Sequence, residues 1–244
     1  MAALLELVLW VVPLLWALYA PLALALERPV ETPGSVYCGS LDEATVFTYG
    51  DVDDGGPGFV LRDSDVNVQQ PHYYFLYENS RDTHPWKYAL LNPGTEVFIS
   101  LCPTFAGRLV RGNPTFNLDG KVHNLGTWVE LSLEGPPSAN GWADVSLLEG
   151  CDGAATIAAM DNSGVSTGFA GDLITGAPVA VLRSKDDRSP AIAKTVGEGA
   201  SDAAMDYELS LLDPMKNASI VDQYKPAIKS QTGRFLVTMY HGSY

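Results

Sequence analysis

The sequence contains little cysteine and little positive charge. Only three of its 244 residues are cysteine, and no CxxC or Cys/His ligand spacing occurs, so a metal site of the zinc type is not supported. Fifteen Lys and Arg stand against 29 Asp and Glu, for a formal net charge of −14. Nucleic acid is not an expected partner, because its phosphates are bound through Lys and Arg. An acidic surface suits a neutral polysaccharide or a cationic partner, or it keeps a secreted protein soluble.

Internal repeats, low-complexity tracts and heptads are also absent from the sequence. A hydrophobic fraction of 46% and an aromatic fraction of 10% are sufficient for a sizeable core, which excludes wholesale disorder. A chain of this length fits one large all-β domain better than two small ones.

One long apolar run occupies residues 1–26. We predict that residues 1–25 are a secretory signal peptide, cut after the small-x-small site Ala23-Leu24-Ala25, although a basic n-region is missing. The alternative, a membrane anchor, is disfavoured by Pro13 and Pro21 and by the lack of flanking positive charge. No membrane association is expected after cleavage.

Secretion into an oxidising compartment predicts one disulfide and one unpaired thiol. Cys102 and Cys151 each end a strand-like run, so they form the favoured pair and Cys38 is left over. The tripeptide Asn217-Ala218-Ser219 is an N-glycosylation sequon, which makes Asn217 a candidate glycosylation site.

Residues 26–65 are predicted to form a loosely structured acidic arm. Two brief β-prone runs, Ala44–Tyr49 and Phe59–Leu61, are expected to add edge strands. The segment Asp51–Gly56 begins like a calcium loop, but a basic residue stands where the bidentate Glu is needed. We therefore interpret it as a solvated acidic turn.

Residues 66–244 are predicted to form a single β-rich domain. Short β-prone runs alternate there with turn signals every 8–12 residues, a pattern typical of a sandwich or barrel. Only Glu198–Leu212 reads as a helix, with Ser201 as its N-cap. The stretch Thr127–Ile157 predicts a β-hairpin, with Glu130 on the polar face of its first strand.

Short motifs recur along this domain in a characteristic order. They are Val66–Gln70 with Tyr73–Leu76, Leu91–Thr95, Gly107–Gly112, Thr127–Leu133, Asp144–Gly150, Ala170–Leu173 with Pro178, and Gly233–Val237. Their order and spacing resemble the thaumatin-like (pathogenesis-related class 5) family, in a short, cysteine-poor form of the kind expected from filamentous fungi. The chain departs from the family by lacking nearly all of its disulfides and its disulfide-rich second domain.

The resemblance implies an all-β fold, an antiparallel β-sandwich of about ten strands with a short helical insert. It also implies an acidic cleft, through which some members bind or slowly hydrolyse β-1,3-glucan. By motif position, Arg108 matches the Arg of that cleft and Glu130 its Glu. Asp144 matches the first Asp, and Glu149 stands where the family has the second.

Glycoside hydrolysis generally uses two carboxyl groups that flank the scissile bond. Glu130 would be the general acid and Asp144 the base or nucleophile, while Arg108 would orient sugar hydroxyls. Glu149 is an odd number of residues from Asp144, so it must lie beyond the strand end to join the cleft. The alternative is that these acids simply cover the solvent-exposed face of an antiparallel sheet.

Aromatic residues provide a second type of candidate contact. Trp128 and Trp142 are placed to stack on sugar rings, and the alternative is that aromatics at period 2 belong to the core.

A rival motif, Gly164–Gly168, fits the G-x-S-x-G nucleophile elbow. An elbow requires a helix after the serine, but Gly171, Gly176 and Pro178 follow and suit a loop. A serine hydrolase is therefore not favoured.

Two functional hypotheses follow. The leading one is a secreted, monomeric protein that binds β-glucan at the cell wall or host interface, with weak endo-β-1,3-glucanase activity and no cofactor. The other is a non-catalytic secreted effector or wall structural protein that works through contacts with host or wall proteins.

Overall fold

The computed structural model describes residues 44–66, 68–79, 81–222 and 226–243. The predicted signal peptide at residues 1–25 and Cys38 lie outside the described residues. Neither helix in the described part of the chain is long and apolar enough to cross a membrane.

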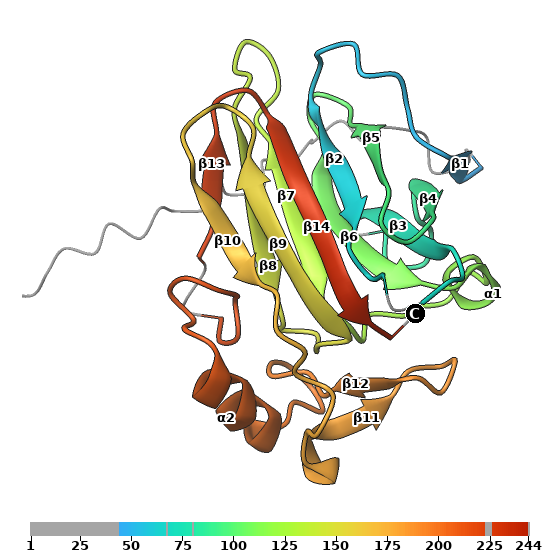
Figure 1. Cartoon of the computed structure of the whole chain (residues 1–244), viewed down its shortest axis with the longest axis vertical. Helices are drawn as coiled ribbons and strands as arrows, with labels where there is room; N and C mark the ends of the chain where they lie inside the picture. The colour runs from blue at the N-terminus through green and yellow to red at the C-terminus, as the bar shows by residue number, and fades with distance from the viewer. Residues whose placement is uncertain (1–43, 67, 80, 223–225, 244) are drawn as a thin grey trace, which may run out of the picture. The chain divides into compact units, whose positions relative to one another are not determined.

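Most of the described chain forms two β-sheets (Figure 1). The larger sheet has seven strands, in the order β1 (Val46–Thr48), β4 (Lys87–Leu91), β3 (His72–Glu78), β6 (Ala106–Gly112), β7 (Trp128–Leu133), β8 (Gly141–Ser146) and β13 (Ile228–Ser230). The smaller sheet has five strands, in the order β10 (Ser166–Phe169), β9 (Gly153–Ala159), β14 (Arg234–Gly242), β2 (Gly58–Asp63) and β5 (Glu96–Ser100).

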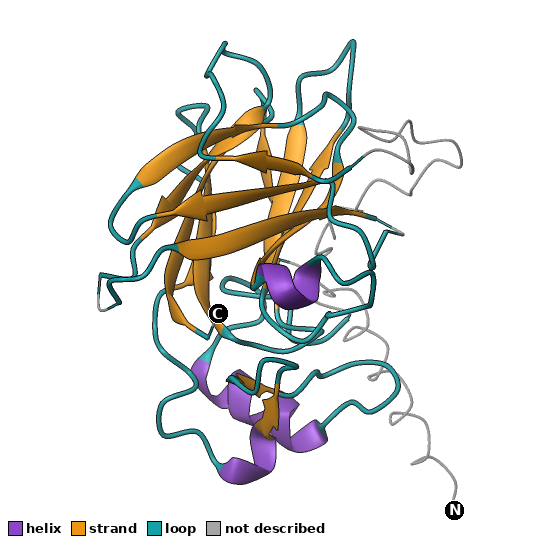
Figure 2. Ribbon diagram, turned by 90° about the vertical axis from the view of Figure 1, so that its right-hand side faces the viewer, coloured by secondary structure: helices purple, strands orange, loops and turns teal. Residues whose placement is uncertain are grey.

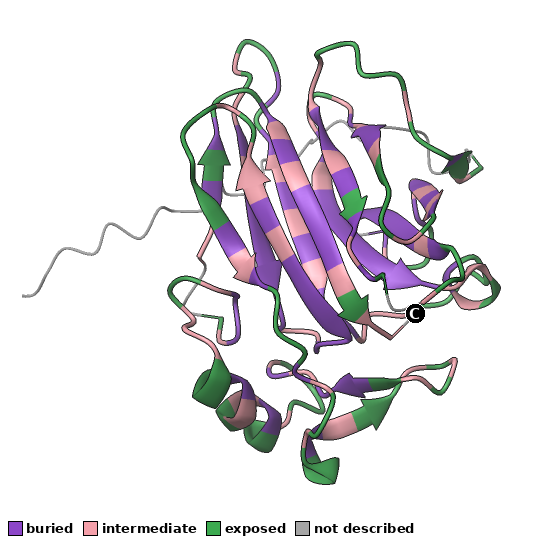
Figure 3. Ribbon diagram, viewed as in Figure 1, coloured by how far each residue is buried: buried purple, intermediate pink, exposed green. Residues whose placement is uncertain are grey.

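The inward faces of the two sheets share one apolar core. Val129 and Leu131 of β7 and Phe235 and Val237 of β14 are almost completely buried in it. A strand presents every second side chain to the same face, and the resulting bands of buried and partly exposed residues are visible in Figure 3. The predicted all-β sandwich is therefore confirmed, with seven strands in one sheet and five in the other.

Two strand pairs are parallel, so the sandwich is not purely antiparallel. β1 runs parallel to β4, and β2 runs parallel to β14. Parallel neighbours need long connections, and β2 and β14 are joined by almost the whole described chain. Segments from its two ends therefore meet inside the smaller sheet.

Residues 44–65 belong to the sandwich and do not form a loosely structured arm. β2 has a neighbour on each side, β14 and β5, so the expectation of an edge strand is wrong for this run. Two of the three acids in the calcium-like turn are ion-paired: Asp51 contacts Lys87 at 2.6 Å, and Asp53 contacts Arg234 at 2.6 Å. Local sequence could not reveal these pairs, because the cations lie 36 and 181 positions away.

A smaller substructure follows β10 in the sequence (Figure 2). It contains the 3-10 turn η1 (Val179–Val181), the hairpin of β11 (Leu182–Ser184) and β12 (Pro190–Ile192), and the helix α2 (Asp202–Leu211). The predicted helix and its cap are confirmed, because the Ser201 hydroxyl accepts a hydrogen bond from the backbone N–H of Ala204. A single-turn helix, α1 (Pro114–Asn117), lies in the loop after β6.

The predicted Cys102–Cys151 disulfide is wrong, because Cys151 is a free, buried thiol. Cys151 lies just before β9 begins, whereas Cys102 follows the end of β5. The register across β5, β2, β14 and β9 aligns the end of β5 with the far end of β9, so two strands and the length of the sheet separate the positions. Burial raises the pKa of the Cys151 thiol to about 12, and the nearby Glu208 carboxylate adds to the rise.

Glu208 is the one fully buried acid of α2. Its side chain is 0% exposed, and within the described residues neither carboxylate oxygen has a hydrogen-bond partner. Desolvation raises its pKa to about 9. At pH values between the ordinary glutamate pKa and about 9, Glu208 is protonated in the native state and ionised in the unfolded chain. The free energy of unfolding then falls by about 1.4 kcal/mol for each unit of rising pH.

We therefore expect Glu208→Gln to stabilise the protein at pH 8 and to have little effect at pH 4, where both states are protonated. Thermal unfolding of the two proteins at both pH values measures this difference. Glu198→Gln is the matched control, because Glu198 is exposed in the preceding loop and should change neither Tm. An equal Tm shift at pH 4 and pH 8 would contradict the neutral, buried state of Glu208.

Candidate functional site

Three charged residues from adjacent strands form a row across the larger sheet. The strand register places Arg108 of β6 opposite Glu130 of β7, and Glu130 opposite Asp144 of β8. Residues directly opposite each other project to the same face, with Cβ atoms about 5 Å apart. Because their neighbours Val129 and Val145 point into the core, the row lies on the outer face of the sandwich. We call Arg108, Glu130 and Asp144 the charged row.

Arg108 is held in place from four sides. Its guanidinium lies over the rings of Tyr77 and Trp128, 4.8 and 4.1 Å from their centroids. It also donates to the Oδ1 of Asp82 at 2.8 Å and to the Oδ1 of Asn124 at 3.2 Å. The side chain is nearly buried, so its charge has a fixed position and orientation at the end of the row.

The two candidate tryptophans are each fixed by polar contacts. Trp128 Nε1 donates to the carbonyl of Asn124 at 2.9 Å, and Arg108 covers one face of its ring. Trp142 Nε1 donates to Glu134 at 3.2 Å, and Lys229 lies 5.4 Å from the centre of its ring. A cation therefore already lies over one face of each indole ring.

Asp144 is buried at the other end of the charged row. Its Oδ2 accepts a hydrogen bond at 2.9 Å from Ser219, which follows α2 in the chain. Ser219 forms a parallel bridge with Ser146, so this segment runs alongside β8. The sequence had given no reason to bring this segment to the site.

Glu149 lies beyond the end of β8, as the odd spacing requires. Within the described part of the chain, no hydrogen bond or ion pair links its carboxylate to Arg108, Glu130 or Asp144. The structure thus brings three of the four predicted cleft residues into one row. It adds Tyr77, Asp82 and Asn124 as supports of Arg108, for which no sequence motif was recognised.

The structure also places the candidate glycosylation site and the serine of the G-x-S-x-G motif. Asn217 donates through Nδ2 to the carbonyl of Gly168 at 3.1 Å, so its amide is used in the fold, and glycosylation stays a prediction. Ser166 begins β10, which pairs with β9 and is followed by a loop, so the nucleophile-elbow geometry is not formed. No group of three or more His, Cys, Asp or Glu suited to a metal ion occurs among the described residues.

A histidine bridge lies beside the site. His123 Nδ1 contacts Asp186 at 2.6 Å and its Nε2 contacts Asp119 at 2.9 Å, which links the loop after α1 to the β11–β12 hairpin. Burial opposes the charge of His123, but the hydrogen bonds that it donates to both carboxylates raise its pKa above the ordinary value. The hydrogen bond from His123 lowers the pKa of Asp119 to about 2.

No protein-family model and no curated protein matches the chain. Among solved structures, the thaumatin-like xylanase inhibitor TLXI aligns with 75% of this chain and 99% of its own, at 10% identity and a TM-score of 0.41. Such a score carries no argument about family or activity, and the sandwich assigned above rests on the strand pairing.

Arg108→Lys should weaken the packing at the site although it keeps the charge, because an ammonium group cannot stack as a plane between Tyr77 and Trp128. We expect a loss of about 1–2 kcal/mol in the free energy of unfolding and a change in tryptophan fluorescence. Denaturant unfolding followed by fluorescence measures both. Arg62→Lys, at an exposed ion pair with Glu96, is the control and should change neither. An unfolding curve for Arg108→Lys that matches the control would contradict the stacked arrangement.

The histidine bridge predicts a pH-dependent contribution to stability. The pKa of His123 is higher in the folded state than its unfolded value of about 6.5. The stabilisation of the folded state by protonated His123 is therefore complete below about pH 6.5 and is lost as the pH rises through the folded-state pKa. The contribution of Asp119 is present above its unfolded pKa and is lost as the pH falls toward 2. Thus His123→Gln should lower Tm most near pH 5 and least near pH 9. The exposed His84, changed to Gln, should show no such profile.

Proposed function

We propose that this chain is a secreted, thaumatin-like protein of the cell wall or host interface that binds β-1,3-glucan on the outer face of its larger sheet. The observation that carries the proposal is the charged row. The family resemblance points to Arg108, Glu130 and Asp144 from the sequence alone. Their alignment in one register row supports a common ligand site.

The chemistry of the charged row suits a neutral, hydroxyl-rich ligand. Carboxylates accept hydrogen bonds from sugar hydroxyls, and a guanidinium donates to them. The net charge of −14 would repel an anionic polymer but not a neutral glucan. Because Arg108 is already oriented by Tyr77, Trp128 and Asp82, little side-chain entropy would be lost when a ligand binds there.

Hydrolysis is a separate part of the proposal. Glu130 and Asp144 form a cross-strand pair of carboxyl groups, and glycoside hydrolysis uses two carboxyl groups on either side of the bond. In this scheme the partly exposed Glu130 protonates the leaving oxygen, while the more buried Asp144 acts as base or nucleophile. Any such activity is expected to be weak.

A non-catalytic role through protein contacts is the second candidate. The observation that favours it is that Asp144 is buried and hydrogen-bonded to Ser219, and that a cation lies over the ring of each candidate tryptophan. A row that is built into the fold in this way leaves fewer groups for a sugar. Under this alternative, changes in exposed loops would abolish function and changes in the row would not.

The test is retention of the mature protein on insoluble β-1,3-glucan, chitin and cellulose, with reducing ends assayed in the same tubes. We expect selective retention on β-1,3-glucan, at least tenfold weaker retention for Glu130→Gln, and no sugar release by that variant. Glu96→Gln, an exposed acid of the smaller sheet, is the matched control and should behave as the parent protein. Equal retention of parent and Glu130→Gln would remove the charged row as the binding site. No retention on any glycan would favour the protein-contact alternative.

A further inference from the structure

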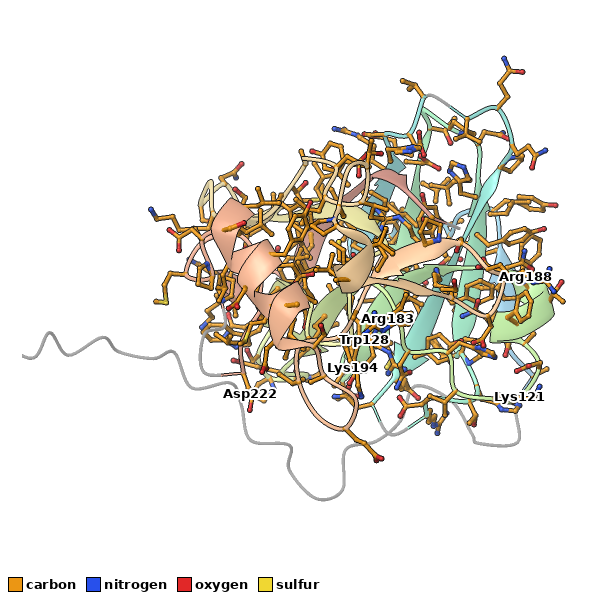
Figure 4. The ribbon with its side chains drawn as sticks, turned by 90° about the horizontal axis from the view of Figure 1, so that it is seen from below. Lys121, Trp128, Arg183, Arg188, Lys194 and Asp222 are labelled. Atoms are coloured by element: carbon orange, nitrogen blue, oxygen red, sulfur yellow. The ribbon has the colours of Figure 1, made fainter. Side chains whose placement is uncertain are left out.

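A polar cavity lies outside the charged row. It has a volume of about 290 Å³, is open to solvent, and lies between the loop around α1 and the turn of the β11–β12 hairpin. Asn113, Phe116 and Asn124 line the first wall, and Ser184, Lys185 and Asp187 line the second. In Figure 4, Lys121 and Arg188, which flank these walls in the sequence, both lie toward the same edge of the molecule. The volume is near the lower end of the range for small-ligand pockets.

Each cation that lines the cavity is paired with a carboxylate. Lys185 contacts the buried Asp152 at 2.7 Å, and Arg111 contacts the same carboxylate at 3.3 Å. His123 lies between two carboxylates, Asp119 and Asp186. Among the described residues that line the cavity, no cation is without a carboxylate partner, and within the described ranges no cluster of ligands suits a metal ion. The wall therefore favours a ligand that is neither an anion nor a metal ion, such as a neutral polar molecule.

Several polar atoms of the lining are not used by the fold. The amide oxygens of Asn113 and Asn124 accept hydrogen bonds from Thr115 and Arg108, but among the described residues their Nδ2 groups donate none. Ser184 makes no side-chain hydrogen bond there, and Asp187 uses only Oδ1. The cavity thus offers two free amide donors, a hydroxyl and a carboxylate oxygen.

We propose that this cavity binds a single neutral sugar ring. Each sugar hydroxyl both donates and accepts, so it can pair with the free amides on one wall and with Ser184 and Asp187 on the other. Phe116 supplies the apolar surface that the C–H face of a pyranose requires. The bridge through His123 joins the two walls, so the cavity is formed before the ligand arrives.

The site is distinct from the charged row, and Asn124 connects the two. Asn124 lines the cavity, its Oδ1 accepts a hydrogen bond from Arg108, and its backbone carbonyl accepts one from the Trp128 indole. A glycan could therefore place one ring in the cavity and its next rings toward Arg108. The cavity proposal itself requires only the lining groups and stands whether or not the row binds glucan.

The experiment is an NMR titration of the full chain with glucose and with a β-1,3-linked glucose trisaccharide, and in parallel with inorganic phosphate and calcium chloride. We expect saturable shifts with the sugars only. Ser184→Trp fills the cavity and should weaken binding at least tenfold, whereas Ser166→Trp, at an exposed position on β10, should not. Asn113→Asp keeps the Oδ1 cap of α1 but removes the Nδ2 donors, so it should also weaken binding while the fold is retained.

Glu130→Gln separates this proposal from the proposed function, because it should leave sugar binding in the cavity unchanged even if retention on insoluble glucan is lost. Saturable sugar binding that survives both Ser184→Trp and Asn113→Asp would overturn the cavity as the site. Absence of sugar binding, or saturable binding of phosphate or calcium with the same residues, would overturn its ligand class.

Discussion

The segments that surround the charged row and the cavity are held together by one buried carboxylate. Asp152 is 1% exposed, and its two oxygens accept from the backbone N–H of Thr127, from Arg111 and from Lys185. Its carbonyl accepts from the backbone of Ser243. One residue thus joins the end of β6, the start of β7, the β11–β12 hairpin and the C-terminal segment. A buried charge is costly unless it is paired in this way, so these four segments are held in a single arrangement.

That network also explains a backbone requirement nearby. Gly126 has a φ of +153°, and a Cβ at this position would lie 2.6 Å from the Asp152 carboxylate. Only glycine lets the chain pass so close to Asp152 and turn directly into β7. The backbone N–H of Thr127 then donates to Asp152 one residue before β7, the strand that places Glu130 between Arg108 and Asp144.

The charged row and the cavity show two ways in which a fold prepares polar groups. In the row, Arg108 is oriented by aromatic rings and by Asp82, so its charge is fixed before any ligand binds. In the cavity, the lining cations are engaged in ion pairs, which leaves amides, a hydroxyl and a carboxylate oxygen for a ligand. Asn124 connects the two, because it supports Arg108 and lines the cavity at once.

Local sequence pattern was sufficient wherever the cause was local. The period-2 alternation of Val129 and Leu131 predicted which face of β7 is buried, and Ser201 predicted the start of α2, because a strand face and a helix cap each depend on a few neighbouring residues. Contacts between distant segments had no such signal. The insertion of β2 between β14 and β5, the free thiol of Cys151, and the approach of Ser219 to Asp144 were decided only when the strands paired. These three features depend on how distant strands pair across the sheets, and no single stretch of sequence determines that pairing.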